Sequence, residues 1–440
     1  MQAYFYELVD ALRAKLRGGE ILLANFSGEE SDFVRFNRSR VRQAGRVSQA
    51  YFGIELVDGG RHAKGSLSLS RRKRADKAEL AAMLDGLRAQ LQHAPEDPYL
   101  LYATEVRSGE RHGRDRLPDR GEALAAILGA GEGRDLVGIY AQGGIYRGFA
   151  NSLGQRNWFA THSFNLDWSF YHAADKAVKS RYAGFEWSGE EFERRVARAA
   201  EQLAVLARPP RTIAPGKYRV YLAPTAMEDF VDMLCWGGFS LKAQKTKTTP
   251  LLKMLAGEAR LSPKIAIREN TAGGIAPDFQ AQGFIRPDQV ELIAGGGIRD
   301  CLVSPRSGKE YGLEPNGAAG DEPPESLDMD GGDIPAGEVL ARLGTGIWVN
   351  QTWYLNFSDR AACRVTGMTR FATFWVEDGA IAAPLNVMRF DETVYRALGE
   401  NLIGLTAERD FLLSPGSYGG RSTESARLPG ALIDDFTFTL

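Results

Sequence analysis

Residues 144–172 have the sequence GIYRGFANSLGQRNWFATHSFNLDWSFYH, in which two runs of alternating apolar and polar residues flank Asn151-Ser152. Alternation with a period of two is typical of half-buried strands, so this stretch predicts two strands and the turn between them. A third strand-like run, KAVKSRYAGFEWS, and a helical run, GEEFERRVARAAEQLAVLA, follow at 176–188 and 189–207. The predicted unit is three strands followed by a helix.

The same order of patterns occurs earlier in the chain. Residues 32–45, 47–57 and 59–70 are strand-like, and the helical run ADKAELAAMLDGLRAQLQ follows at 75–92. Asn37 occupies the place in the first unit that Asn151 occupies in the second. We interpret the pattern as an ancient duplication. Because short turns join these strands, we expect an antiparallel sheet with helices on one face.

The length of the chain, 440 residues, indicates two or three domains. Pro209-Pro210 ends the second helical run, and a strand-like run follows it. We therefore predict an α+β protein with a duplicated antiparallel sheet-plus-helix N-terminal domain, 1–210, and a β-rich C-terminal domain, 211–440. Within the second domain, the acidic, Gly- and Pro-rich stretch 317–338 is expected to be an exposed loop.

Charge and composition exclude several classes of function. The net charge is −2, so no global field attracts nucleic acid or an anionic membrane. No run of about 18 apolar residues predicts a membrane span. Three widely spaced cysteines give no disulfide framework, and a reducing cytoplasm is the expected setting. All five histidines lie within the first 172 residues, so a C-terminal site could not use the usual His ligands or His base.

The stretch 223–240, APTAMEDFVDMLCWGGFS, predicts a helix that ends at Gly237-Gly238. Thr225 and Glu228 match a capping box, in which Thr225 caps the helix and Glu228 reaches back to a free amide. Asp229 and Asp232 lie off the apolar stripe that the helix presents. The stripe consists of Met227, Phe230, Val231, Leu234 and Cys235. The carboxylates could form an acid-base or metal site, but such a pair needs burial to separate its two pKa values. We therefore favour the interpretation that these residues form a well-made helix and not a catalytic or metal site.

Five segments, in this order, resemble the TldD/PmbA family, once named modulators of DNA gyrase. They are FANSLGQRNWFATHSFNLDWSFY (149–171), KTKTTPLLKMLAGEARLSPKIAIREN (245–270), DMDGGDIPAGEVLARLGTGIWVNQ (328–351), VTGMTRFATFWVEDGAIAAP (365–384) and LPGALIDDFTFTL (428–440). The chain departs from common PmbA-type members at WGGFSLKAQK (236–245) and at QTWYLNF (351–357). Because of these departures, the resemblance does not identify the partner or the substrate.

The resemblance implies a division of labour within the family. TldD-type chains carry His-Glu-x-x-x-His on the central helix and bind zinc for peptide hydrolysis, whereas PmbA-type chains, also called TldE, lack the motif and pair with a TldD-type subunit. Met227, Glu228 and Asp232 stand where the motif has His, Glu and His, which makes 226–236 a degenerate zinc helix. Cys363 lies near the region where TldD-type members supply a thiolate. Neither methionine nor a lone cysteine completes a zinc site.

The resemblance therefore implies a non-catalytic PmbA/TldE-type subunit of a zinc metallopeptidase, cytoplasmic and acting on unfolded peptides. No metal or cofactor is expected in this chain, and zinc is expected in a TldD-type partner, with which it forms a heterodimer. Two alternatives stay open. One is an autonomous peptidase or hydrolase with a site that uses no histidine, and the other is a homodimeric peptide-binding module.

Overall fold

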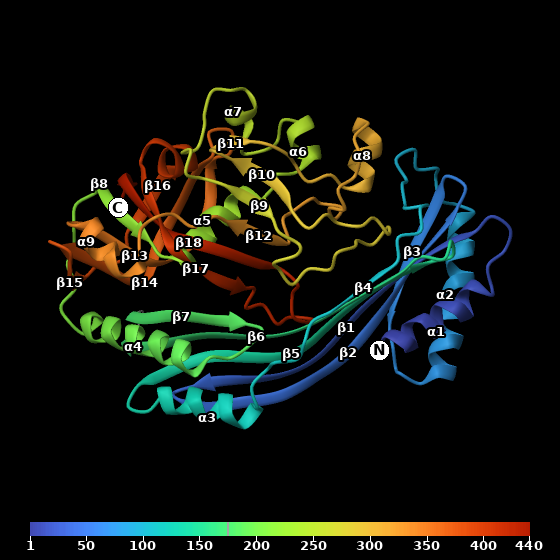
Figure 1. Cartoon of the computed structure of the whole chain (residues 1–440), viewed down its shortest axis with the longest axis horizontal. Coiled ribbons are helices and arrows are strands. Elements are labelled where there is room, and N and C mark those ends of the chain that lie inside the picture. Colours follow the sequence, from blue (N-terminus) through green and yellow to red (C-terminus); the bar gives the residue numbers. More distant parts are fainter. Residues whose placement is uncertain (174–175) are drawn as a thin grey trace.

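The computed structural model describes residues 1–173 and 176–440, which form two large sheets with helices at their faces (Figure 1). The expected boundary at 210/211 falls in the connection between the last helix of the first half and the first strand of the second. The predicted α+β class is confirmed. No helix in these two described ranges is both long and apolar enough to cross a membrane.

The first sheet has seven strands, in the order β3-β2-β1-β5-β6-β4, and β7 also pairs with β6. All pairs are antiparallel except β4 with β6. The strands are β1 (Ile21–Asn37), β2 (Arg40–Asp58), β3 (Arg61–Ser68), β4 (Gly109–His112), β5 (Asp135–Asn151), β6 (Arg156–Ala173) and β7 (Lys176–Gly184). The accompanying helices are α1 (Gln2–Arg13), α2 (Lys73–Leu91), α3 (Arg120–Ala130) and α4 (Gly189–Leu206).

Each half of this domain repeats the order helix, three strands, helix, and the two halves meet at the antiparallel pair β1–β5. Phe36, which precedes Asn37, pairs with Gly138 near the start of β5. Ala150, which precedes Asn151, pairs with Ala24 near the start of β1. The two asparagines thus end corresponding strands, as the duplication requires. Helices α1 and α3 are the first helices of the two units.

Serine side chains make the contact that the two units share. The N–H of Ser39 donates to the carbonyl of Leu136 (3.0 Å), and the Ser39 hydroxyl accepts from the N–H of Leu136 (3.0 Å). Ser152 makes the same pair of bonds to Leu22, at 2.9 and 3.1 Å. Asn151 also binds its turn, because its side chain accepts from the N–H of Gln155 (3.0 Å).

The helices lie on one face of the first sheet, as expected. Helices α1 and α2 pack on aromatic residues at one end, among them Phe26, Phe52 and Trp158, and α3 and α4 pack on another cluster at the other end that includes Trp168. The opposite face is turned toward the C-terminal domain (Figure 1). Contacts across this boundary include Phe149 with Phe279 and the hydrogen bonds that Arg421 donates to Ser163.

The second sheet has eleven strands and is mixed, since β13 pairs with β8 and β12 with β18 in parallel. Its strands are β8 (Gly216–Leu222), β9 (Ile267–Glu269), β10 (Val290–Ala294), β11 (Gly297–Ile298), β12 (Ser326–Met329), β13 (Gly346–Asp359), β14 (Arg364–Glu377), β15 (Ala380–Pro384), β16 (Arg389–Thr393), β17 (Leu402–Leu413) and β18 (Ser425–Phe438). Its helices are α5 (Pro224–Cys235), α6 (Leu241–Lys245), α7 (Leu252–Leu255), α8 (Pro305–Tyr311) and α9 (Val339–Leu343), with single turns at Ala336–Glu338 and Arg396–Glu400. Helix α5 packs against β13 and β18.

The prediction of an exposed loop at 317–338 is wrong in part. Strand β12 lies within this stretch, and all four of its residues are buried. Asp328 of this strand is buried, and Arg409 donates to its carboxylate (2.6 Å). This pairing offsets the cost of removing the carboxylate charge from water. Composition alone could not show the arginine that a distant strand supplies.

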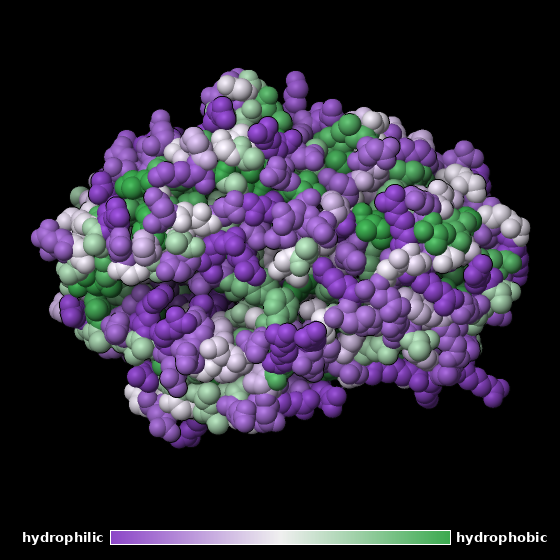
Figure 2. All heavy atoms as spheres, in the orientation of Figure 1, coloured by the Kyte–Doolittle hydropathy of each residue, from purple (hydrophilic) through white to green (hydrophobic). Residues whose placement is uncertain are grey.

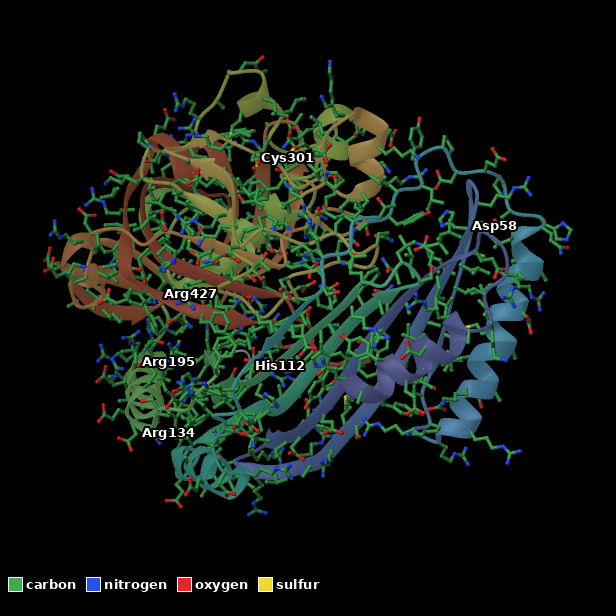
Figure 3. The ribbon with its side chains drawn as sticks, turned by 45° about the vertical axis from the view of Figure 1, so that its right-hand side comes forward. Asp58, His112, Arg134, Arg195, Cys301 and Arg427 are labelled. Carbon is green, nitrogen blue, oxygen red and sulfur yellow. The ribbon has the colours of Figure 1, made fainter. Side chains whose placement is uncertain are left out.

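Ion pairs link the two domains beside α4. Arg195 of α4 donates to Asp410 of β17 (2.8 Å), and Figure 3 shows Arg195 where α4 faces the second sheet. The face of the molecule seen in Figure 2 is mostly hydrophilic, and its apolar residues form small separate patches. The apolar material of the chain is instead gathered in the cores of the two domains and in the layer between them.

Candidate functional site

Helix α5 begins two residues earlier than a capping box at Thr225 would require. Its N-cap is Ala223, and Pro224 occupies the first helical position, where the missing N–H costs nothing. The Thr225 hydroxyl donates to the carbonyl of Asn350 on β13 (2.6 Å) and does not cap the helix. The predicted capping box of Thr225 and Glu228 is therefore wrong. Thr225 instead fixes the start of α5 to the second sheet.

The apolar stripe of α5 is confirmed by burial. Met227 is 0% exposed and packs in the main core of the C-terminal domain. Phe230, Val231 and Leu234 follow it at helical spacing and are also buried. The Met227 thioether therefore serves as core packing, and its sulfur has no open side at which a ligand could bind.

Glu228 extends from α5 toward the N-terminal domain. Its carboxylate accepts from the guanidinium of Arg181 on β7, which also donates to Asp167 of β6 (3.1 Å). The side chain of Arg181 is only 8% exposed, so the ion pair lies between the two domains in a largely dry place. Burial raises the pKa of Glu228 to about 7, although Arg181 favours the charged form. The expectation that Glu228 would serve only as a helix cap is thus replaced by a domain-linking role.

The other two carboxylates of α5 have different surroundings. Asp229 accepts from the Gln351 side-chain amide and from the Thr352 hydroxyl, both at 2.8 Å, which ties it to β13. Burial raises the pKa of Asp229. Asp232, as expected, is exposed to solvent. Glu228 therefore points toward the N-terminal domain, whereas Asp229 and Asp232 both line one hollow beside the helix.

A hollow of about 520 Å³ lies beside α5. Asp229, Asp232 and the C-cap residue Trp236 line it on the helix side, and aromatic residues form much of the opposite rim: Trp353, Tyr354 and Phe371. Arg370 stacks on the ring of Trp353 at 3.9 Å. Sequence reasoning missed this rim, although the unusual segment at 351–357 was a signal for it.

Two of the rim residues have backbone conformations that side chains rarely adopt. Tyr354 has φ 59° and Phe371 has φ 58°, each inside a strand. Bulky residues in the left-handed region are strained, and such strain is often found at binding sites. Tyr354 is 76% exposed, so packing of its own ring does not explain the conformation.

Comparison with known proteins places the chain. Residues 215–440 match the family model described as the PmbA/TldA metallopeptidase C-terminal domain. The chain belongs to the PmbA/TldD family. No curated protein matches the sequence significantly.

Solved structures from the PmbA/TldD family share the fold over the whole chain. TldE from Thermococcus kodakarensis has a TM-score of 0.78 at 14% identity, covering 99% of this chain and 100% of that one. A proposed modulator of a DNA gyrase from Thermotoga maritima gives 0.75 at 16% identity, with coverages of 99% and 100%. A proposed modulator of DNA gyrase from Bacteroides thetaiotaomicron gives 0.73 at 14% identity, with coverages of 99% and 98%.

The residues of this PmbA/TldD member do not fit the zinc that the family name implies. Among residues 1–173 and 176–440, no three His, Cys, Asp or Glu side chains lie close enough together to hold a metal ion. Met227 is buried in the core, and Glu228 is neutralised by Arg181. Cys363 is also fully buried, and burial raises the pKa of its thiol to about 12, so it is not a ready thiolate.

Proposed function

We propose that this chain is a non-catalytic, PmbA/TldE-type subunit of a cytoplasmic zinc metallopeptidase. The proposal rests on what the residues at the zinc-motif positions do in this chain. Met227 fills the core, and Glu228 forms an ion pair that joins the two domains. A catalytic zinc helix needs its ligands free to face an open site. In this chain Met227 and Glu228 instead stabilise the fold.

A TldD-type partner supplies the zinc and the activated water in this proposal, and the two subunits act together on unfolded peptides. Zinc lowers the pKa of bound water to about 7 and polarises the scissile carbonyl. This chain contributes the surfaces that hold the partner and the peptide. An extended peptide can be held by main-chain pairing at a sheet edge, which does not depend on its sequence.

The experiment compares the chain alone, a TldD-type subunit alone, and their mixture on an unfolded, fluorescently labelled peptide. Size-exclusion chromatography is expected to show a heterodimer, and only the mixture or the partner should cleave, with cleavage lost after addition of a chelator. Glu228→Gln in this chain should leave the rate per folded complex unchanged. The same change at the motif glutamate of the partner is the matched control and should abolish cleavage.

The two alternatives predict different results in the same experiment. An autonomous hydrolase would cleave the peptide alone, and its activity would survive the chelator. A homodimeric binding module would elute as a homodimer and would not bind the TldD-type chain. Either result contradicts the proposed subunit role.

A further inference from the structure

A second hollow lies far from α5, between the N-terminal sheet and loops of the C-terminal domain. Its volume is about 630 Å³, and strands β1, β2, β3 and β5 form one wall. The segments 277–282 and 319–320, together with Arg286 and Glu325, form the other. Much of the lining is apolar, including Pro277, Phe279 and Ala281. Apolar walls with a few placed polar groups at a domain boundary are typical of ligand sites.

The register of the first sheet places Arg147 in this hollow. Ser27 of β1 pairs with Arg147 of β5 on one side and with Tyr51 of β2 on the other. Directly paired residues of an antiparallel sheet share a face. These three side chains therefore form a row on the face that is turned toward the C-terminal domain, and all three line the hollow.

Arg147 carries a charge that the described residues do not pair. Its guanidinium donates to the neighbouring carbonyl of Tyr146 (3.0 Å), and no described carboxylate oxygen lies within the 4.0 Å that defines an ion pair. Burial lowers the pKa of Arg147, while Glu29 and Glu325 favour its charged form from a greater distance. A half-buried charge of this kind is costly unless something pairs with it.

Both nearby acids are already engaged by other groups. Glu29 accepts from the Gln49 side chain (3.1 Å) and from the N–H of Arg421 (3.0 Å). Glu325 accepts from a terminal nitrogen of Arg286 at 2.5 Å. Neither carboxylate is therefore available as a close partner for Arg147.

Two residues that line the same hollow carry buried donors without acceptors. The Nε of Arg286 and the side-chain Nε2 of Gln280 are both buried and make no hydrogen bond to the described part of the chain. Gln280 is only 5% exposed. Nearly all buried donors in folded proteins are paired, so orphaned donors from two residues beside an unpaired guanidinium indicate a missing acceptor.

We propose that this hollow, which we name the carboxylate pocket, binds the C-terminal carboxylate of an unfolded peptide. Arginine donors match the fork of a carboxylate, and the apolar walls suit the side chain of the terminal residue. A free phosphate would use the donors but would leave the apolar walls unused. The oxyanion chemistry follows from the pocket itself, and the identification of the ligand as a peptide rests on the proposed function.

The test measures binding of a fluorescent peptide ending in leucine, as the free acid and as the amide, to the chain alone. The free acid is expected to bind at least about tenfold more tightly, because hydrogen bonds to a charged group are strong. Arg147→Met should abolish the difference between acid and amide. Arg35→Met, on the exposed surface of β1, is the matched control and should keep it. Gln280→Leu should weaken binding of the acid several-fold and decides the matter if Arg147→Met does not fold.

A stability readout separates a binding role from a structural one. Removing an unpaired, half-buried charge should raise the melting temperature of Arg147→Met without ligand, whereas loss of a structural arginine would lower it. The free-acid peptide should raise the melting temperature of the wild type only. Equal binding of acid and amide overturns the proposal, as does binding of inorganic phosphate with no binding of peptide. These measurements need neither zinc nor a partner, so their failure is distinct from failure of the subunit role.

Discussion

The ion pair of Arg181 and Glu228 permits a quantitative prediction about the boundary between the domains. Arg181→Met leaves Glu228 in a site where burial has already raised its pKa from 4.5 to about 7 with the arginine present. Breaking a buried pair by removing one partner typically costs about 3–5 kcal/mol. We expect a loss of that size in the free energy of unfolding at pH 8.5, where Glu228 is charged in the wild type.

The same loss should be smaller at pH 5.5. The folded-state pKa of Glu228 lies above its ordinary value, so its contribution to stability is fully present below pH 4.5 and is lost as the pH rises through about 7. In the wild type, the rise of the Glu228 pKa from 4.5 to about 7 corresponds to about 3 kcal/mol in the free energy of unfolding. Without Arg181 the carboxylate takes up its proton still more readily, and at pH 5.5 the folded variant holds a neutral Glu228. The remaining loss comes from packing and from Asp167.

Urea denaturation at both pH values measures these free energies. The double variant Arg181→Met/Glu228→Gln should recover most of the loss at pH 8.5, because no uncompensated carboxylate is left at position 228. Arg194→Met, which removes a surface arginine 75% exposed, is the control and should change stability by less than about 1 kcal/mol. Equal losses at the two pH values, or no recovery in the double variant, would refute the reasoning.

The remaining predictions concern single features of the two domains. Ser39→Ala and Ser152→Ala should each cost about 1 kcal/mol in urea denaturation, because each leaves an equivalent backbone N–H without its acceptor, and unequal effects would count against the duplication. Tyr354→Gly should raise the melting temperature by relieving the strain at φ 59°, whereas Trp353→Gly on the same strand should lower it. Met227→Ala should cost about 2–5 kcal/mol, because it opens a cavity in the core, yet should leave peptide cleavage by the folded complex unchanged.

Much of the first domain could be predicted from its sequence, because strand alternation and short turns are local signals. The turns at Asn37 and Asn151 mark equivalent strand ends, and the register of β1 with β5 supports the same equivalence. The serine contacts of Ser39 and Ser152 could not be predicted, since they join residues that are 97 and 130 positions apart.

The candidate site was predicted less well than the fold. The family resemblance placed Met227 and Asp232 at the positions of metal ligands, and burial of Met227 agrees with a structural role. It did not show Arg181, which comes from the other domain and forms an ion pair with Glu228. The prediction of a capping box was wrong because the helix begins at Pro224, which leaves Thr225 inside the helix. Pairing between distant elements is a tertiary property that local patterns do not contain.

The central claim is that this chain holds no catalytic metal and needs a partner to work with one. The direct measurement is zinc content by mass spectrometry of the chain purified alone, of its Asp232→Ala variant, and of the complex with a TldD-type subunit. The chain alone is predicted to carry far less than one zinc per protomer, with no change in the variant, and the complex about one zinc per pair of subunits. Stoichiometric zinc in the chain alone, lost in Asp232→Ala, would contradict the account and make α5 a metal site.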